Sequence, residues 1–356
     1  MRCVLVTGGT GLVGSAIVEA LPLGVEVLSL TRHGATGWTD EDARELHAAG
    51  ALVSAGAGHV VGGCEAAHVE HVRGDLTQPR LGLSSAAYAT LAARVDVVIH
   101  AAGVTDYTTP RAVTDAINVD GTRTVARFAE DAGAALYHVS TGYIGAQGAS
   151  VRGRFGAQVY LDSKRAAEQV AGACRTLAAI VRPSLVFGHS RDGSASSFQG
   201  LHRLIGLLLE NQLPLLPFAA ATRVDYLPRD LVGRAIAECA LGGFTGELWV
   251  TAGAHAPTFG RVVELLRAFA GERGRHIDPP RFVTQEMIDR LLRPMGGPAL
   301  ARRIELLLAL TSHLVEQPLP SSLAAVPPEL EAVLLRGTAH WAQRTGWEAA
   351  PEAVAT

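Results

Sequence analysis

A short apolar segment followed by three regularly spaced glycines opens the chain, and few folds accommodate this combination. Residues 3–6 predict a buried strand, and residues 12–21 predict a helix that begins within the glycine-rich turn. Gly8 permits a tight turn, Gly11 lets the backbone approach a pyrophosphate, and Gly14 lets the helix pack closely against the strand. A phosphate would then lie at the helix N-terminus, where unpaired N–H groups and the helix dipole favour anions. The segment therefore predicts a dinucleotide-binding unit, with an ordinary strand-to-helix turn as the alternative.

Apolar runs and helical patterns alternate through the first half of the chain. Residues 112–132 and 163–177 predict helices between strands. Strands that alternate with helices imply right-handed crossovers and a parallel sheet covered by helices on both faces. The pattern predicts an α/β fold, a Rossmann-type doubly wound parallel sheet with a smaller, mainly helical C-terminal portion. The further strands of this sheet are predicted at residues 25–30, 69–72, 95–100, 135–139 and 178–181.

Tyr160 and Lys164 are four residues apart, and residues with this spacing share a face of a helix. The ammonium of Lys164 can then lie beside the phenol of Tyr160 and lower its pKa from about 10 toward neutrality. A tyrosine of that kind exchanges a proton with a substrate oxygen. The same spacing also occurs in helices that carry a surface tyrosine and a solvated lysine. Together with the dinucleotide-binding unit, the pair predicts an oxidoreductase that uses a nicotinamide cofactor.

Several motifs resemble, in kind and in order, those of the extended short-chain dehydrogenase/reductases. The glycine spacing of residues 8–14 is that of this superfamily, and Gly-Asp-Leu at residues 74–76 resembles its adenine-binding element. His-Ala-Ala-Gly at residues 100–103 resembles the loop beneath the adenine ribose. Residues 138–141 end a predicted strand where the family keeps a catalytic Ser or Thr, and residues 182–188 resemble the stretch that holds the nicotinamide amide.

This resemblance implies roles for individual residues. The implied catalytic set is Thr141, Tyr160, Lys164 and Asn118. Tyr160 would donate a proton to the carbonyl oxygen, Thr141 would hydrogen-bond that oxygen, and Lys164 would hold the nicotinamide ribose, while Asn118 orders a water or backbone contact near Lys164. Besides Tyr160 and Lys164, the implied cofactor contacts are Gly8, Thr10, Gly11, Leu12, Val13, Gly14, Asp75, Leu76, Ala101, Ala102, Gly103, Pro183 and Val186. The implied substrate contacts are Thr105, Gly142, Tyr143, Ser184 and Arg191.

Three segments, residues 74–83, 188–193 and 224–230, narrow the resemblance to thioester reductase domains. Such domains terminate some nonribosomal peptide synthetases and polyketide synthases, and they also occur in carboxylic acid reductases. The resemblance covers about residues 1–270. It implies reduction of an acyl thioester, bound to a carrier protein or to CoA, to an aldehyde or alcohol in the biosynthesis of a secondary metabolite or lipid. The sequence contains no carrier attachment motif. The chain could act in trans on a substrate bound to an acyl or peptidyl carrier protein, it could have been repurposed for a free ketone or aldehyde, or it could be a domain excised from a larger enzyme.

Two other kinds of function stay open beside thioester reduction. An extended reductase or dehydrogenase could act on a free ketone or aldehyde, or on a sugar nucleotide as a dehydrogenase, epimerase or dehydratase. A non-catalytic NADP-sensing protein is an alternative of another class. The intact set of Thr141, Tyr160 and Lys164 speaks against a loss of catalysis.

The end of the second predicted strand indicates which nicotinamide cofactor is used. NAD-binding folds usually place an Asp or Glu there, where it accepts hydrogen bonds from the ribose 2′-hydroxyl. This chain has Arg32 instead and no acid until Asp40. A guanidinium pairs with the 2′-phosphate of NADP through charge-assisted bonds. The sequence therefore predicts NADPH (NADP+) as the cofactor, with a surface arginine that binds no ligand as the alternative.

Charge and composition indicate a cytoplasmic enzyme that binds neither nucleic acid nor a metal. The net charge of −3 gives no support to binding of nucleic acid or acidic membranes. The four cysteines lack metal-ligand spacing, and the thirteen histidines contain no His-x-x-x-His pair. The first predicted strand begins at once, which leaves no room for a signal peptide, and no apolar run is long enough for a membrane span.

The chain is expected to form a NADP-binding Rossmann domain and a smaller substrate-binding portion. The Rossmann domain is predicted at residues 1–188, with residues 224–251 returning to it. The substrate-binding lid is predicted at residues 189–223 and 252–356, whose apolar character suits an acyl or polyketide chain. Helices of the C-terminal third are predicted at residues 196–210, 230–241, 258–268, 285–292 and 299–313.

Overall fold

The computed structural model describes residues 2–32, 53–54, 69–107, 109–145, 157–198, 200–287, 290, 311, 313–325 and 329–347. The chain divides into two compact units. The first unit comprises Met1–Ile144, Gln158–Pro183 and Asp230–Val250. The second unit comprises Gly145–Ala157, Ser184–Arg229 and Thr251–Thr356.

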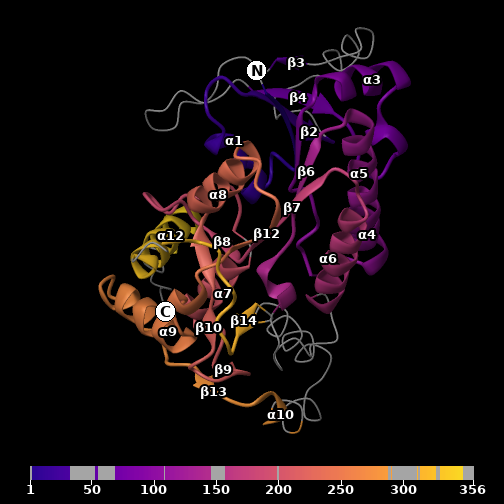
Figure 1. The fold of residues 1–356 in the computed structure, drawn as a ribbon. Helices are drawn as coiled ribbons and strands as arrows, with labels where there is room; N and C mark the ends of the chain where they lie inside the picture. Colours follow the sequence, from indigo (N-terminus) through magenta and orange to yellow (C-terminus); the bar gives the residue numbers. More distant parts are fainter. Residues whose placement is uncertain are drawn as a thin grey trace, which may run out of the picture. The chain divides into compact units, whose positions relative to one another are not determined.

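A sheet of eight strands in the order β12-β7-β6-β5-β1-β2-β4-β3 forms the centre of the first unit (Figure 1). Seven strands run parallel, and the short edge strand β3 pairs antiparallel with β4. Strand order reverses between β1 and β5, so the segments that follow these two strands lead to opposite faces of the sheet (Figure 1), at the point where doubly wound folds bind ligands. The predicted Rossmann-type fold is confirmed. The strands are β1 (Cys3–Thr7), β2 (Glu26–Thr31), β3 (Val53–Ser54), β4 (Val69–Arg73), β5 (Val97–His100), β6 (Ala135–Val139), β7 (Leu177–Pro183) and β12 (Gly246–Val250).

Helices cover both faces of this sheet. Helices α4, α5 and α6 lie on one face, and α1 and α8 lie on the other (Figure 1). Helices α1 and α8 approach closely, since a Cβ added at Gly233 would lie 2.2 Å from the carbonyl oxygen of Ala16. The helices of this unit are α1 (Leu12–Ala20), α3 (Ser85–Arg94), α4 (Arg111–Asp115), α5 (Gly121–Ala132), α6 (Ala157–Gly172) and α8 (Arg229–Leu241). The predicted helix at residues 112–132 is thus present, although a π-helical turn, η2 (Ala116–Asp120), interrupts it.

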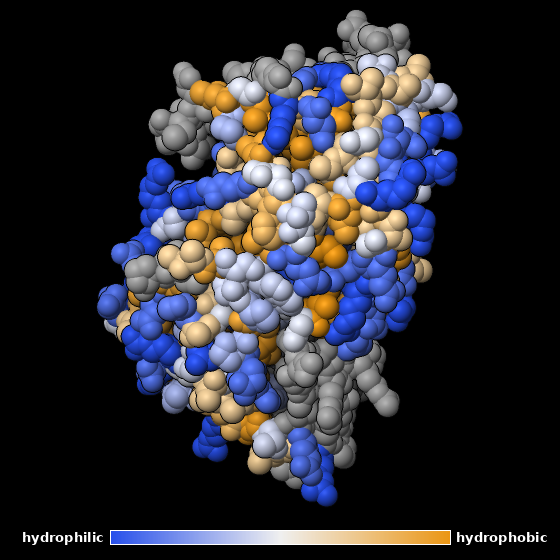
Figure 2. Space-filling view, in the orientation of Figure 1, coloured by the Kyte–Doolittle hydropathy of each residue, from blue (hydrophilic) through white to orange (hydrophobic). Residues whose placement is uncertain are grey.

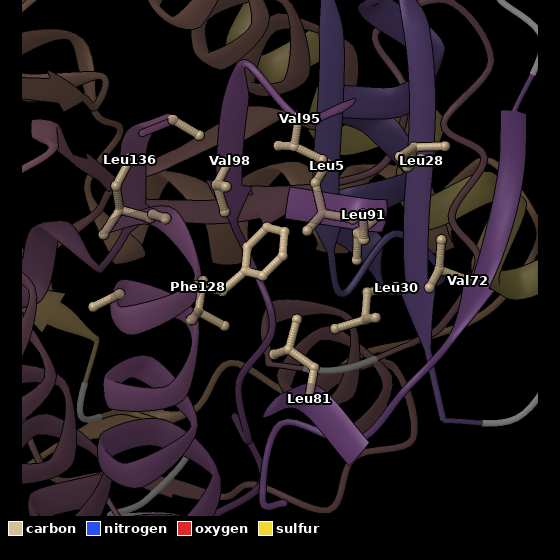
Figure 3. Packing of buried hydrophobic residues seen from close by; sticks show 14 of the residues in the cluster. Leu5, Leu28, Leu30, Val72, Leu81, Leu91, Val95, Val98, Phe128 and Leu136 are labelled. Atoms are coloured by element: carbon tan, nitrogen blue, oxygen red, sulfur yellow. The ribbon is translucent and has the colours of Figure 1, made fainter. Parts of the chain in front are cut away.

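The core on the α5 side of the sheet explains why these strands are apolar. Side chains from five strands, β1, β2, β4, β5 and β6, form a cluster with Phe128 of α5, which is fully buried (Figure 3). Burial of each such Leu or Phe side chain stabilises the fold by about 1.5–3 kcal/mol. The strand residues in this cluster include Leu5, Leu28, Val98 and Leu136.

The second unit is built from short two-stranded sheets and helices. Strand β8 (Leu185–Phe187) pairs in parallel with β11 (Tyr226–Pro228), and β10 (Arg223–Val224) pairs antiparallel with β14 (Leu314–Val315). Strand β9 (Leu215–Leu216) pairs with β13 (Arg281–Phe282). The helices are α7 (Leu201–Leu209), α9 (Phe259–Gly271), α10 (Gln285–Met287) and α12 (Leu330–Thr345). Most of the helix expected at residues 299–313 lies outside the described residues.

Helix α12 is absent from the sequence-based expectations, in which the last helix is the one at residues 299–313. Gly337 lies within α12. The structure gives the glycine a packing role. A Cβ at Gly337 would lie 2.3 Å from the ring of Phe187, and a Cβ at Gly193 would lie 2.2 Å from the carbonyl oxygen of Arg336. The hydroxyl of Tyr226 also donates to the carbonyl oxygen of Leu330 at 2.7 Å. Helix α12 therefore packs directly on β8, β11 and the loop after β8.

The boundary between the units differs from the expected one. Residues 184–188 and 224–229, which were expected in the Rossmann domain, belong to the second unit. The reason is that β8 and β11 pair with each other and not with the central sheet. Only residues 230–250 return to the first unit, where β12 pairs with β7.

Hydrophilic and hydrophobic residues are intermixed on the face of the molecule in Figure 2. The large hydrophobic side chains found exposed in the described residues are scattered along the sequence, at Leu23, Val113, Phe244 and Met287. Within that described part, no helix combines the length and the apolar character needed to cross a membrane.

Candidate active site

The glycine-rich turn between β1 and α1 leaves no space for a side chain at Gly8 or at Gly14. Gly8 has a φ of 74°, and a Cβ there would lie 2.7 Å from the backbone of Ala102. A Cβ at Gly14 would lie 2.0 Å from the carbonyl oxygen of Gly8. Thr10 and Gly11 are exposed beside this turn, and Leu12 and Val13 form the start of α1. Gly11 caps α1 without a side-chain hydrogen bond, which leaves main-chain N–H groups at the helix start available for an anion.

Polar groups at the ends of β2 and β4 include the residues predicted to contact the adenosine part of the cofactor. Arg32 directly follows β2, and Asp75 and Leu76 follow β4. Burial opposes ionisation of Asp75, yet hydrogen bonds from Thr77 and the positive charge of Arg32 hold its pKa below the ordinary value. The hydroxyl of Thr31 is buried and has no hydrogen-bond partner among the described residues. The hydroxyl of Thr31, which lacks a partner among the described residues, and the exposed guanidinium of Arg32 could both bind ribose or phosphate oxygens of a dinucleotide.

The loop after β5 connects the glycine-rich turn with the predicted catalytic residues. Ala101 and Ala102 lie against Gly8, and Ala102 donates its N–H to the hydroxyl of Thr7 at 3.3 Å. At Gly103 an added Cβ would lie 3.2 Å from the Asn118 amide oxygen and 3.9 Å from the Lys164 ammonium. The expected cofactor loop therefore contacts two of the four residues expected to be catalytic.

Thr141, Tyr160 and Lys164 meet at the carboxyl end of β6. Tyr160 and Lys164 project from α6, and both are nearly buried. The hydroxyl of Thr141 hydrogen-bonds to the phenol of Tyr160, and the ammonium of Lys164 donates to the carbonyl oxygen of Val139 at 2.8 Å. The ring of Tyr107 packs edge-on against Tyr160 with their centroids 5.7 Å apart. Tyr107 carried no signal in the sequence, because its loop has neither a motif nor a helical pattern.

The expected lowering of the Tyr160 pKa is contradicted by the structure. Burial of the phenol raises its pKa to about 12, and the hydrogen bond from Thr141 lowers it only in part. The pKa of Lys164 is shifted as well. Burial of the ammonium lowers this pKa to about 8, although the negative charge of Glu168 acts in the opposite direction. Sharing a helix face was the basis of the expectation, but burial penalises the phenolate more strongly than the nearby groups stabilise it.

Asn118 lies in the π-helical turn, a feature that is frequent at functional sites. Its amide is fully hydrogen-bonded. The oxygen accepts from the N–H of Val104 at 2.7 Å, and the nitrogen donates to the carbonyl oxygen of Val104 at 3.1 Å and to the hydroxyl of Ser163 at 2.9 Å. Ser163 in turn donates to the carbonyl oxygen of Tyr160 at 2.7 Å. Ser163 was not anticipated from the sequence, although its place one residue before Lys164 was a usable signal.

The expected substrate residues fall into two groups. Thr105, Gly142 and Tyr143 belong to the first unit; Thr105 is exposed, and the other two are buried in the turn η3 (Gly142–Gly145). Ser184 and Arg191 belong to the second unit, as does the expected cofactor residue Val186 in β8, whereas Pro183 ends β7 in the first unit.

The loop that carries Arg191 has a defined shape. Gly193 donates its N–H to the carbonyl oxygen of His189 at 2.8 Å, and Ser194 accepts from the N–H of His189 through its carbonyl oxygen at the same distance. Arg191 itself is exposed, and its N–H donates to the His189 ring. No group of three or more residues suited to holding a metal ion occurs among the described positions.

The parallel sheet and its glycine-rich first turn define a class of protein, and the chain is an NAD-binding protein of the extended short-chain dehydrogenase/reductase type. It belongs to the Male sterility protein family of NAD-binding proteins, whose profile matches residues 6–236. The predicted membership of the extended superfamily and the use of a nicotinamide cofactor are thereby confirmed.

Individual relatives include reductases from multidomain synthetases. The chain is 32% identical over 186 residues to the glycine betaine reductase ATRR of Emericella nidulans, a match that spans 47% of this chain and 14% of that protein. The crystal structure of the terminal R domain of the myxalamid PKS-NRPS pathway shares the fold, with a TM-score of 0.67, 22% identity and coverage of 99% of this chain and 93% of that one. A thiolation-reductase di-domain from an archaeal non-ribosomal peptide synthetase aligns with a TM-score of 0.63 and 16% identity, covering 98% of this chain and 76% of that one.

Proposed function

We propose that the chain is an NADPH-dependent reductase that converts an acyl thioester to an aldehyde or an alcohol. The observation that carries this proposal is the buried set of Thr141, Tyr160 and Lys164 at the carboxyl end of β6, beside the loop of Gly103. A phenol whose pKa is about 12 keeps its proton at neutral pH, so Tyr160 suits donation to a carbonyl oxygen in the reductive direction.

Each residue of the set has a definite task in this reaction. NADPH, when bound, supplies hydride to the carbonyl carbon. Tyr160 gives its proton to the carbonyl oxygen, and Thr141 donates a hydrogen bond to the charge that develops there. The tetrahedral product then loses a thiol and leaves an aldehyde. Lys164, fixed by the Val139 carbonyl oxygen, is the cation nearest this chemistry and would also hold the nicotinamide ribose.

Thioesters are favoured over free carbonyl compounds by the segments at residues 74–83 and 188–193 and by the kind of relatives found. One of the similar structures is a thiolation-reductase di-domain of a non-ribosomal peptide synthetase, and another is the terminal R domain of a PKS-NRPS pathway. In the first segment, Asp75 is close enough to Arg32 for their charges to interact, and Leu81 is buried in the core. An acyl or peptidyl carrier protein would present the substrate.

Thiol release is the direct test of this function. Purified protein should oxidise NADPH when given an acyl-pantetheine thioester and release one thiol for each aldehyde formed, measured with a thiol-reactive dye. Reduction of a free ketone consumes NADPH without freeing sulfur, so the two readouts separate the substrate classes. Much faster reduction of free aldehydes or ketones than of any thioester would refute the thioester assignment and favour a reductase of small carbonyl compounds.

The cofactor preference is tested at Arg32. We expect Arg32→Ala to raise the dissociation constant for NADPH by about tenfold, because loss of charge-assisted bonds to the 2′-phosphate costs about 1.4 kcal/mol. Affinity for NADH should barely change, as titration by protein fluorescence would show. Arg175→Ala is a matched control, since this arginine is exposed before the amino end of β7 and should affect neither cofactor. Equal weakening of both cofactors would contradict the 2′-phosphate assignment.

A further inference from the structure

His100, at the carboxyl end of β5, is completely buried between two threonine hydroxyls. Its Nδ1 lies 2.7 Å from the hydroxyl oxygen of Thr7, at the end of β1. Its Nε2 lies 3.0 Å from the hydroxyl oxygen of Thr122, in α5. The imidazole thus joins three elements of the first unit directly behind the loop that carries Gly103.

Hydrogen-bond directions follow from the outer partners of the two threonines. Thr122 donates its only hydroxyl hydrogen to the carbonyl oxygen of Asn118 at 2.6 Å, so it must accept from Nε2–H of His100. Nδ1 of the neutral ring is then an acceptor and receives the hydroxyl hydrogen of Thr7. Thr7 in turn accepts the N–H of Ala102. The bonds run in one direction from Ala102 to Asn118, and this direction requires the neutral Nε2–H tautomer.

The surroundings of His100 keep it neutral. Burial lowers its pKa to about 3, and the nearby positive charge of Lys164 on α6 acts in the same direction. On the neighbouring strand β6, the ring of His138 lies 5.4 Å away, and burial lowers its pKa as well. A second proton on His100 would also place a donor against the hydroxyl hydrogen of Thr7. The series of hydrogen bonds from Ala102 through Thr7, His100 and Thr122 to Asn118, called the relay below, is therefore independent of pH in the neutral range.

Both ends of the relay reach groups of the candidate site. At one end, Ala102 belongs to the loop that lies against Gly8. At the other end, Asn118 is held at its backbone carbonyl by Thr122, while its side chain holds Val104 and Ser163. Ser163 then fixes the carbonyl oxygen of Tyr160. The imidazole connects these two sets of hydrogen bonds from behind the loop, in addition to the direct bonds between Val104 and the Asn118 side chain.

We propose that His100 is a positioning residue that, as the Nε2–H tautomer, couples the loop of Ala102 through Thr7 and Thr122 to Asn118 and the Tyr160 turn of α6. This inference rests on the proposed function, because the two ends are the expected cofactor loop and proton donor. It assigns separate tasks to the two threonines. The Thr7 side supports cofactor binding, and the Thr122 side supports the placement of Tyr160.

The test uses two isosteric substitutions in the full chain. With Thr122→Val, we expect kcat to fall about tenfold at saturating NADPH while the NADPH dissociation constant stays within about twofold, a loss of about 1.4 kcal/mol in the barrier alone. With Thr7→Val, we expect the reverse, an NADPH dissociation constant raised about tenfold with kcat nearly unchanged. This split would not arise from general destabilisation.

Thr338→Val in α12 is the matched control. Thr338 is also a buried helical threonine that donates to the carbonyl oxygen four residues earlier, at 2.8 Å from Leu334, and it is remote in sequence from the relay. It should change neither kcat nor the NADPH dissociation constant. If Thr122→Val behaved like Thr338→Val, or if both relay variants changed kcat and affinity in parallel, the positioning role of His100 would be refuted.

The tautomer provides a readout that does not depend on turnover. In ¹H–¹⁵N spectra of histidine-labelled protein, the signal that disappears in His100→Gln should show a proton on Nε2 and none on Nδ1, unchanged between about pH 5 and pH 8. A proton on Nδ1, or titration in that range, would overturn the inference even if thioester reduction were established. Absence of thioester reduction together with the expected tautomer and NADPH-binding effects would instead place the failure in the proposed substrate.

Discussion

Replacing Tyr160 with phenylalanine should lower the rate of thioester reduction by about a hundredfold or more, because general acid catalysis typically contributes that much. NADPH affinity should stay almost unchanged, because the phenyl ring still fills the buried place beside Tyr107. Single-turnover oxidation of NADPH at saturating thioester would measure the effect. The hydride would still be available, so the loss would appear in the chemical step.

Two further variants show whether the loss of rate in Tyr160→Phe is caused by loss of the phenol proton. Tyr88→Phe removes another hydrogen-bonded phenol of the first unit, one that donates to Asp131 at 2.8 Å, and it should leave the rate unchanged. Lys164→Ala should lower both the rate and the affinity for NADPH, because that ammonium is expected to serve the ribose as well. Near-normal turnover of Tyr160→Phe on a thioester would show that the proton comes from elsewhere and that Tyr160 is not the acid.

Placing an alanine at Gly14 should weaken NADPH binding by about a hundredfold or more, equivalent to at least about 2.7 kcal/mol. The added Cβ would lie 2.0 Å from the carbonyl oxygen of Gly8, and backbone on both sides prevents a small adjustment. The turn must therefore open, and its N–H groups would no longer converge on a pyrophosphate. Equilibrium titration with NADPH would measure this loss.

Gly172→Ala is the matched control for this substitution. Gly172 ends α6, and a Cβ there would have no heavy atom within 4 Å in the described structure. It should bind NADPH as the unchanged protein does, and its melting temperature should be the same or slightly higher, since alanine is the better helix former. If Gly14→Ala bound NADPH normally, the cofactor would not lie on this turn.

Local patterns in the sequence were sufficient for the cofactor half of the fold. The strand–turn–helix of residues 3–21 was predictable because glycine spacing and apolar periodicity depend on neighbouring residues only. The alternation of strands and helices then required a parallel sheet, since parallel strands need long crossovers. Family membership followed from the same local motifs.

Contacts between residues that are far apart in the sequence could not be predicted from local sequence patterns. Helix α12 was not predicted, and the structure shows that it packs through Gly337 against Phe187, which lies 150 positions earlier in the sequence. The unit boundary moved to Pro183 because pairing of β8 with β11 joins segments about forty residues apart along the chain. Strand pairing over such a separation leaves no mark in either segment alone.

The sequence by itself determined that the chain has a glycine-rich dinucleotide turn, a doubly wound sheet and a Tyr160–Lys164 pair on one helix. The tertiary structure alone decided the electrostatics of that pair, because the pKa of a phenol depends on which segments bury it. It also decided that His100 lies between Thr7, 93 positions earlier, and Thr122, 22 positions later. Spacing along a chain sets which residues can share an element, whereas solvation and hydrogen-bond direction depend on the elements that fold around them.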